Sequence, residues 1–148
     1  MIFREAVADD IAAMHVIRMS VRENKLNNPL LVTPADYLPM ITQEGKGWVC
    51  TIDNLIVGFA IIDVSNRNIW ALFVHPDWEA KGIGKRLHNK MINWYFNNYK
   101  EKIWLSTAPN TRAEKFYNLL GWTYTGQTKG GEARFEMSAK NYSDALLK

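Results

Sequence analysis

The chain contains 148 residues, carries a formal net charge of +3 and has a sequence pI near 9.0. This length predicts one domain, residues 1–148, whose core needs neither a metal nor a disulfide framework, and the single cysteine, Cys50, excludes an internal disulfide. The small positive surplus suits an anionic ligand without singling out nucleic acid, and the short apolar runs predict neither a membrane span nor a leader, hence a cytoplasmic protein.

The first half of the chain has the pattern of one strand, two helices and three further strands. Residues 2–6 alternate like a strand, and the Asp-Asp pair that follows supplies acid at the start of a helix. Thr33 and Pro34 begin a second helix, which we expect to stop at Gly45. The apolar runs GWVCTI, LIVGFAIIDV and NIWALFV are separated by turn residues and predict an antiparallel meander.

The second half alternates helices and strands. Residues 83–95 place apolar side chains on one helix face, and the run KIWLST has the pattern of a strand. Thr111 and Glu114 form a capping box for a further helix, and a hairpin around residues 129–131 closes the chain. The element order β-α-α-β-β-β-α-β-α-β-β therefore predicts a mixed α/β domain of the α+β type.

A loop with two glycines, Gly82 and Gly84, joins the strand that ends in FVHP to a basic helix. A Walker phosphate loop is excluded because Glu79 and Arg86 occupy its glycine and Ser/Thr positions, and a dinucleotide fingerprint lacks its third glycine because Leu87 stands there. A helix N-terminus remains, where backbone N–H groups can approach a pyrophosphate. The positive charge at this helix start comes from Lys81, Lys85 and Arg86.

Two runs, ALFVHPDWEAKGIGKRL and IWLSTAPNTRAEKFYNLLGW, carry a family pattern, and on these residues the chain resembles the GNAT (GCN5-related) N-acetyltransferase superfamily over nearly its whole length. The resemblance implies a single GNAT-like domain. Its sheet would be mixed and mostly antiparallel, with six to seven strands, about four flanking helices and a splayed acyl-CoA site. The sequence departs from the family pattern at Glu79, where Gln or Arg is usual.

The resemblance also implies an enzyme, an acetyl-CoA-dependent N-acyltransferase. It would move the acetyl group of its co-substrate, acetyl-CoA, to a primary amine by direct attack through a tetrahedral intermediate. The expected partner is a small-molecule or peptide amine, with no nucleic acid, no membrane and no metal site, and a homodimer is compatible with the sequence. Two other classes stay open: a catalytically weak acyl-CoA-binding sensor, and a basic nucleic-acid-binding module.

The resemblance assigns the cofactor to one strand end, the glycine loop and a later helix. Its cofactor-binding residues are Leu72, Phe73, Val74, Lys81, Gly82, Ile83, Gly84, Lys85, Asn110 and Tyr117. Tyr117 matches the tyrosine that in many relatives protonates the leaving thiolate, which makes it the catalytic candidate, although a tyrosine on the same stripe as Phe116 also suits a core. Asn110 suits a turn equally well.

The acceptor amine is expected between the two N-terminal helices and the last hairpin. Its candidate contacts are Glu23, Asn24, Tyr37 and Glu132. No acid lies in NIWALFV or IWLST, so no general base is assigned. Glu23, Asp63 or Glu132 acting through water, or deprotonation in solvent before binding, all stay open as routes to the free amine.

Overall fold

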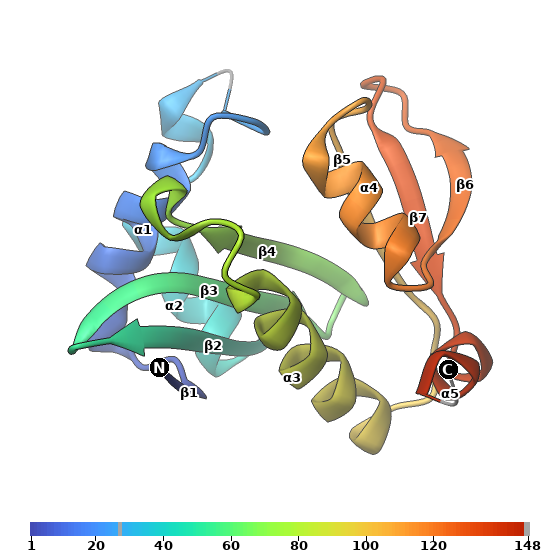
Figure 1. The fold of residues 1–148 in the computed structure, drawn as a ribbon, viewed down its shortest axis with the longest axis horizontal. Helices are drawn as coiled ribbons and strands as arrows, with labels where there is room; N and C mark the ends of the chain where they lie inside the picture. Colours follow the sequence, from blue (N-terminus) through green and yellow to red (C-terminus); the bar gives the residue numbers. More distant parts are fainter. Residues whose placement is uncertain (27, 147–148) are drawn as a thin grey trace. The chain divides into compact units, whose positions relative to one another are not determined.

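The structure is a computed structural model that describes residues 1–26 and 28–146, and these contain seven strands and five α-helices (Figure 1). The strands are β1 (Ile2–Glu5), β2 (Gly45–Ile52), β3 (Leu55–Asp63), β4 (Asn68–Val74), β5 (Ile103–Thr107), β6 (Thr123–Gln127) and β7 (Ala133–Met137). The helices are α1 (Ile11–Ser20), α2 (Pro34–Thr42), α3 (Ile83–Asn98), α4 (Arg112–Leu119) and α5 (Ala139–Leu146), with short 3-10 turns η1 (Ala8–Asp10), η2 (Pro29–Leu31) and η3 (Pro76–Trp78). The chain divides into two compact units, Met1–Trp94 and Tyr95–Lys148.

The N-terminal unit is built on four antiparallel strands in the order β1-β2-β3-β4. One row across this sheet pairs Arg4 with Val49, Val49 with Phe59, and Phe59 with Phe73. Helices α1 and α2 cover one face of these strands, and the part of α3 in this unit lies on the other face (Figure 1). The two layers of helix enclose the sheet, so its central strands are apolar on both faces, as fully buried strands are.

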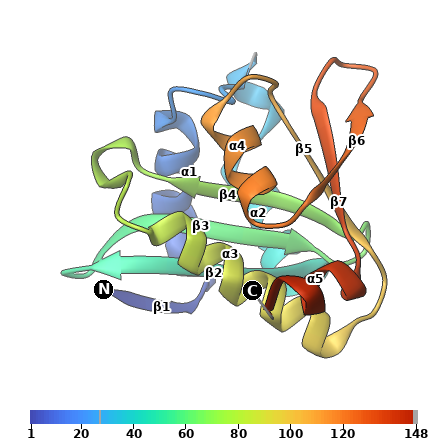
Figure 2. The same cartoon turned by 45° about the vertical axis from the view of Figure 1, so that its right-hand side comes forward.

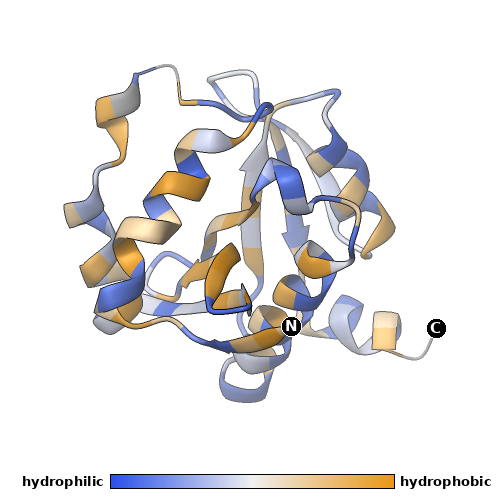
Figure 3. Ribbon diagram, turned by 60° about the vertical axis from the view of Figure 1, so that its left-hand side comes forward, coloured by the Kyte–Doolittle hydropathy of each residue, from blue (hydrophilic) through white to orange (hydrophobic). Residues whose placement is uncertain are grey.

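The core of this unit lies between the sheet and the two N-terminal helices. Its buried members are Met14, Ile17, Tyr37, Val49, Phe59, Ile61 and Ala71. Each large apolar side chain taken fully from water contributes about 1.5–3 kcal/mol, so the contact of α1 with β3 and β4 is a main source of stability. On the helices, hydrophobic positions recur among hydrophilic ones, as the bands of colour in Figure 3 show.

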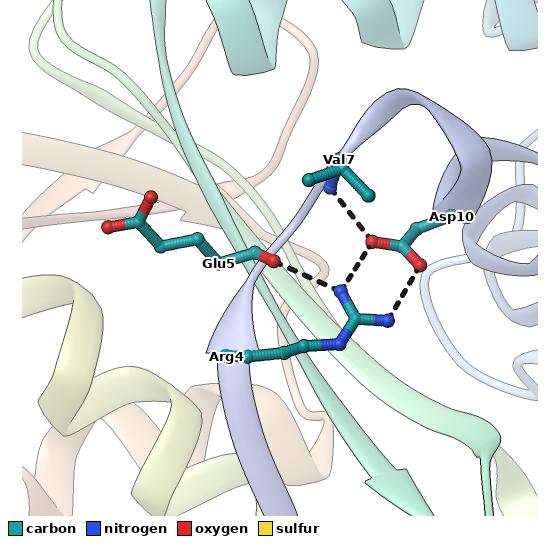
Figure 4. A network of polar contacts seen from close by, with 4 residues as sticks. All are labelled: Arg4, Glu5, Val7 and Asp10. Atoms are coloured by element: carbon teal, nitrogen blue, oxygen red, sulfur yellow. Dashed lines mark hydrogen bonds and ion pairs between the residues drawn. The ribbon is translucent and has the colours of Figure 1, made fainter.

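A charged network fixes the entry of the chain into α1 (Figure 4). The Arg4 guanidinium donates to both carboxylate oxygens of Asp10, at 2.8 and 2.9 Å, and the Val7 N–H donates to the same carboxylate at 2.8 Å. The hydrogen bond from Arg4 is the main cause that lowers the pKa of Asp10. This network caps the helical segment and holds β1 beside it.

Gly58 allows α3 to pack closely on β3. A Cβ at this position would lie 3.1 Å from side-chain carbons of both Ile83 and Leu87, and 3.3 Å from the Phe73 carbonyl oxygen. These contacts are tighter than ordinary van der Waals separations, so the missing side chain is what places the first turns of α3 against the sheet. The start of α3 is thereby held next to the end of β4.

The C-terminal unit has three antiparallel strands in the order β5-β7-β6. Helix α4 packs against β7, with the ring of Tyr117 6.3 Å from that of Phe135 (Figure 2). Gly121, with a φ of +92°, follows the end of α4 in the left-handed conformation that glycine tolerates. Helix α5 stacks Tyr142 on Phe96, in the last turns of α3, at 4.9 Å.

The expected fold class is confirmed, with two local corrections. The prediction that the last hairpin closes the chain was wrong, because α5 follows β7 and raises the helix count to five. Gly45 was expected to stop the second helix, but α2 ends at Thr42 and Gly45 begins β2, where a Cβ would lie 1.7 Å from the Ile62 carbonyl oxygen. The single-domain prediction stays a prediction. No helix within residues 1–26 and 28–146 has both the length and the apolar character to cross a membrane.

Candidate functional site

The end of β4 leads into a tightly bonded turn before α3. The His75 N–H donates to the Val57 carbonyl at 2.8 Å, which extends the contact with β3, and the His75 Nδ1 accepts from the Asp77 N–H at 3.1 Å. Pro76 begins η3, and Ala80 then adopts a positive φ of +61°. The chain is therefore turned sharply between β4 and the helix that follows.

The glycine loop itself is open at the backbone. Gly82 has a φ of +80°, and a Cβ built there would meet no protein atom within 4 Å. Its carbonyl accepts from the Arg86 N–H at 3.2 Å, while Ile83, with 1% exposure, anchors the first turn in the core. An α-helix start presents N–H groups without intrahelical partners and a partial positive charge, so this turn can bind a phosphate closely.

The basic side chains of the loop divide into two groups. Lys81 and Lys85 are exposed, and no ion pair joins either to an acid within the part of the chain that the structure describes. Arg86 instead lies against β1, with its Cζ 4.2 Å from the centroid of the Phe3 ring and Nη1 3.5 Å from Met1 Sδ. Arg86 is therefore held beside Phe3, whereas the two lysines are not, and the expectation that all three supply charge to the loop stays a prediction.

The strand residues expected to line the acyl group lie together on β4. Leu72, Phe73 and Val74 are half-buried and pair with Ala60, Phe59 and Gly58 of β3. The Phe73 ring lies 5.9 Å from the Phe59 ring, on the face covered by α1 and α2. Glu79, the departure from the family pattern, is half-buried just after η3, and its N–H donates to the Pro76 carbonyl at 3.4 Å.

Tyr117 is buried in the C-terminal unit. Its ring contacts those of Phe116 at 5.2 Å, Trp122 at 5.7 Å and Phe135 at 6.3 Å. Burial raises the pKa of the Tyr117 hydroxyl well above its usual value, so the group is neutral over the physiological pH range. The packing role that the sequence left open is confirmed, and the catalytic role stays a prediction.

Asn110 precedes the first turn of α4 with a φ of +60°. Asparagine tolerates this left-handed conformation better than most residues, and the Asn110 N–H donates to Glu114 Oε2 at 2.5 Å. The Glu114 N–H in turn donates to Thr111 Oγ1 at 3.3 Å, which is the capping interaction predicted there. Asn110 is thus a turn residue, and its contact with a cofactor stays a prediction.

The residues proposed for the acceptor have different surroundings. Tyr37 has 0% exposure and lies in the core, with its hydroxyl 3.1 Å from His15 Nδ1, so it presents no surface to a ligand here. Glu23 is exposed and Asn24 has a φ of +59° in the segment after α1. Glu132 is exposed beside β7 and accepts from Ser106 Oγ, on β5, at 3.2 Å. Contact of any of them with an acceptor stays a prediction.

Asp63, one of the carboxylates left open as a base, has a structural role in the β3–β4 turn. It is 3% exposed and accepts hydrogen bonds from the backbone and side-chain nitrogens of Asn66, at 3.2 and 2.8 Å. A carboxylate engaged in this way is unsuited to collect a proton from a substrate. Glu23 and Glu132 remain as open alternatives beside solvent.

The sequence analysis missed Arg18. This residue follows Ile17 on α1, and its Cζ lies 4.3 Å from the centroid of the Phe73 ring. Its Nη1 is buried, and no atom within residues 1–26 and 28–146 accepts a hydrogen bond from it. The signal was available in the sequence, because Arg18 stands four residues after Met14 and so shares the apolar stripe of α1.

Comparison with known proteins identifies the family of the chain. The model of the acetyltransferase (GNAT) family matches residues 12–122, three-quarters of the chain, and the protein belongs to that family. Acetyl-CoA, the expected co-substrate, is the family's co-substrate. The search of curated proteins found no match.

Solved structures share the fold over most of the chain. The GCN5-related N-acetyltransferase from Rhodopseudomonas palustris has a TM-score of 0.78 and 15% identity, with 93% of this chain and 94% of that chain covered. The yncA protein from Salmonella typhimurium, solved with acetyl-CoA, has a TM-score of 0.76 and 19% identity, with 94% of each chain covered. The ribosomal-protein-S18-alanine N-acetyltransferase from Escherichia coli has a TM-score of 0.73 and 18% identity, with 92% and 90% covered.

Proposed function

We propose that the protein transfers the acetyl group of acetyl-CoA to a primary amine. The observation that carries the proposal is the start of α3, where Gly82 leaves the backbone open and Lys81 and Lys85 are exposed, with no acidic partner among the residues that the structure describes. Membership of an acetyltransferase family supports the same ligand, and one structural neighbour was solved with acetyl-CoA.

The cofactor would bind through its pyrophosphate at this helix start. Backbone N–H groups from Gly82 to Lys85 would donate to the phosphate oxygens, and the two lysines would balance their charge. Gly84, in the first turn, keeps side-chain bulk away from the same backbone. The pantetheine arm would then run along β4, where the backbone of Leu72, Phe73 and Val74 supplies donors and acceptors.

The reaction follows from holding an activated ester next to an amine. The amine nitrogen attacks the thioester carbonyl carbon, a backbone N–H of β4 donates to the oxyanion, and the tetrahedral intermediate collapses as the C–S bond breaks. The departing sulfur takes a proton, for which Tyr117 is the candidate donor, and the amine proton leaves to solvent. Orientation supplies most of the rate, since well-placed neighbours reach effective molarities of about 10⁵–10⁸ M.

A thermal melt with coenzyme A, acetyl-CoA and longer acyl homologues tests the first step. A ligand at 100 times its Kd should raise the free energy of unfolding by about 2.7 kcal/mol. Thiol release with a panel of primary amines tests the second step. Stabilisation by acetyl-CoA without thiol release from any amine would favour the sensor, and no stabilisation by any coenzyme A species would overturn the proposal.

A further inference from the structure

The Arg18 guanidinium is a buried charge that the proposed function leaves unexplained. It projects from α1 over Phe73, with Cζ 4.3 Å from the ring centroid. Its Nη1 atom is buried and has no acceptor anywhere in residues 1–26 and 28–146. Buried arginines are normally paired with a carboxylate, and contact with an aromatic face offsets only part of the cost of removing the charge from water.

Within residues 1–26 and 28–146, no acid forms an ion pair with Arg18. Burial lowers the pKa of Arg18, and the ionisable group that acts on it is the Tyr37 hydroxyl. Burial raises the pKa of Tyr37 to about 12, so that hydroxyl is neutral near pH 7. Asp36 is the acid nearest in sequence to Tyr37, and its carboxylate accepts a hydrogen bond from the Thr33 N–H at 2.7 Å. The guanidinium therefore retains an unbalanced positive charge within the described chain.

The position of Arg18 separates it from the candidate pyrophosphate site. Phe73 pairs with Phe59 on the sheet face covered by α1 and α2, whereas Gly58, the next residue along β3, faces α3. Lys85 lies in the first turn of α3, and Lys81 stands two residues before that helix. An anion held by Arg18 thus lies on the other face of β4 from the one expected to receive the phosphates.

We propose that Arg18 binds a carboxylate of the acceptor, so that the preferred amines are those that carry a carboxylate, as amino acids do. This inference rests on the proposed transferase function. A planar guanidinium matches a carboxylate through two parallel hydrogen bonds, and Nη1 has its donors unused. Arg18 is half-buried as a whole residue while its Nη1 is buried, so the carboxylate would have to enter from the exposed part of the side chain to reach that atom. The ring beneath it belongs to Phe73, on the strand expected to hold the thioester carbonyl.

The test compares acceptors that differ only in this group. Amino acids and the corresponding amino acid amides serve as probes with acetyl-CoA, in the wild type, in Arg18→Met and in the control Arg67→Met, which removes an exposed arginine from the β3–β4 turn. The ratio of kcat/KM for acid over amide should exceed tenfold in the wild type and the control. It should fall at least tenfold in Arg18→Met through KM for the acid, with KM for acetyl-CoA unchanged. Comparing ratios between variants cancels the different basicity of acid and amide amines.

A wild type that prefers the amides at equal concentrations of unprotonated amine, or an Arg18→Met that keeps the wild-type ratio, would overturn the inference. The same probes are also tested without acetyl-CoA, by melting temperature. Acids should stabilise the wild type and Arg67→Met but not Arg18→Met. If no amine is acetylated and this pattern still appears, the carboxylate site stands while the transferase function fails. Equal stabilisation of all three proteins, or of none, overturns the site whatever the turnover.

The fold of the variant gives an independent readout. Because Arg18→Met removes an unpaired buried charge, it should melt at or above the wild-type temperature, whereas loss of a purely structural arginine would lower that temperature. Should Arg18→Met fail to fold, Arg18→Lys decides the question, since it keeps the charge but loses the planar fork. Its acid-over-amide ratio should fall below the wild-type ratio, and an unchanged ratio would contradict carboxylate binding.

Discussion

The surroundings of Tyr117 fit both a packing role and a role as a proton donor. Three aromatic rings surround it, as in a core, and burial raises its pKa so that it keeps its proton at every pH used for assay. A neutral hydroxyl is nevertheless what a departing thiolate requires. A coenzyme thiol has a pKa of roughly 8–9, like cysteine, so the thiolate can also leave without a proton donor. The largest rate increase that Tyr117 could supply is therefore limited.

Tyr117→Phe keeps the ring and removes only the proton. We expect kcat to fall within about 10²–10⁴-fold, because one general acid contributes that much, while KM for acetyl-CoA stays unchanged. The measurement is steady-state thiol release at saturating amine from pH 6 to 9. Tyr124→Phe is the matched control, since Tyr124 is an exposed tyrosine of the same unit. A kcat equal to that of the wild type would leave Tyr117 as a packing residue.

At the scale of elements, the turn between β4 and α3 is shaped by its backbone more than by its side chains. Gly82 and Gly131 form a matched pair for testing this. Their φ angles are +80° and +84°, and a Cβ at either would meet no protein atom within 4 Å. One precedes α3 and the other lies in the β6–β7 hairpin.

Alanine at either position should cost about 1–2 kcal/mol of stability, because a Cβ disfavours the left-handed conformation. Only Gly82→Ala should also weaken coenzyme A binding, by tenfold or more, since its Cβ occupies the space through which a phosphate approaches. Urea unfolding measures the first effect and calorimetric titration with coenzyme A the second. Equal coenzyme A affinity in both variants would place the pyrophosphate elsewhere.

For the whole molecule, acid should reduce stability through His88. This side chain is 4% exposed, its Nδ1 donates to Asn89 Oδ1 at 2.9 Å, and burial lowers its pKa to about 4. The unfolded chain takes up this proton near pH 6.5 and the folded chain does so only near pH 4. The free energy of unfolding should therefore fall by about 3 kcal/mol as pH drops through this window. Urea unfolding of the wild type and of His88→Gln between pH 7 and 4 measures this loss of stability. An equally steep loss in the variant would exclude His88 as the cause.

Alkali should reduce stability through Tyr37. Burial raises its pKa to about 12 in the folded state, whereas the unfolded chain loses this proton near pH 10. The contribution is thus complete below pH 10 and is lost as pH rises to 12, by up to about 2.7 kcal/mol. In melts between pH 9 and 12, Tyr37→Phe should lose stability less steeply with rising pH than the wild type. The pH dependence that remains in this variant includes the contribution of Tyr117, whose pKa is also raised. If the stability of Tyr37→Phe fell as steeply with pH as that of the wild type, Tyr37 would not be the cause of the alkaline loss.

Local sequence patterns predicted the strands, four of the helices and the glycine loop, because period, caps and turn residues act over a few positions. Contacts between segments that are distant in the sequence could not be predicted from these local patterns. Helix α5 is short, and the stacking of Tyr142 on Phe96, 46 positions earlier, supports it. The contact of Arg86 with Phe3 and that of Arg18 with Phe73 likewise join separate elements. The residues predicted to bind the pyrophosphate all lie in one loop and could be proposed from its sequence, whereas the unpaired state of Arg18 depends on packing across α1 and β4.

Gly58 has a consequence for how affinity in this protein can change. Its missing side chain sets the separation between β3 and α3, because carbons of Ile83 and Leu87 lie only 3.1 Å from where a Cβ would stand. The first turn of α3 cannot move outward without carrying its N–H groups away from β4. With acetyl-CoA bound at this helix start, as we propose, we expect its affinity to depend also on residues beneath the helix that do not contact the ligand. A substitution at position 58 should then change the Kd for acetyl-CoA while the proposed contact residues stay the same.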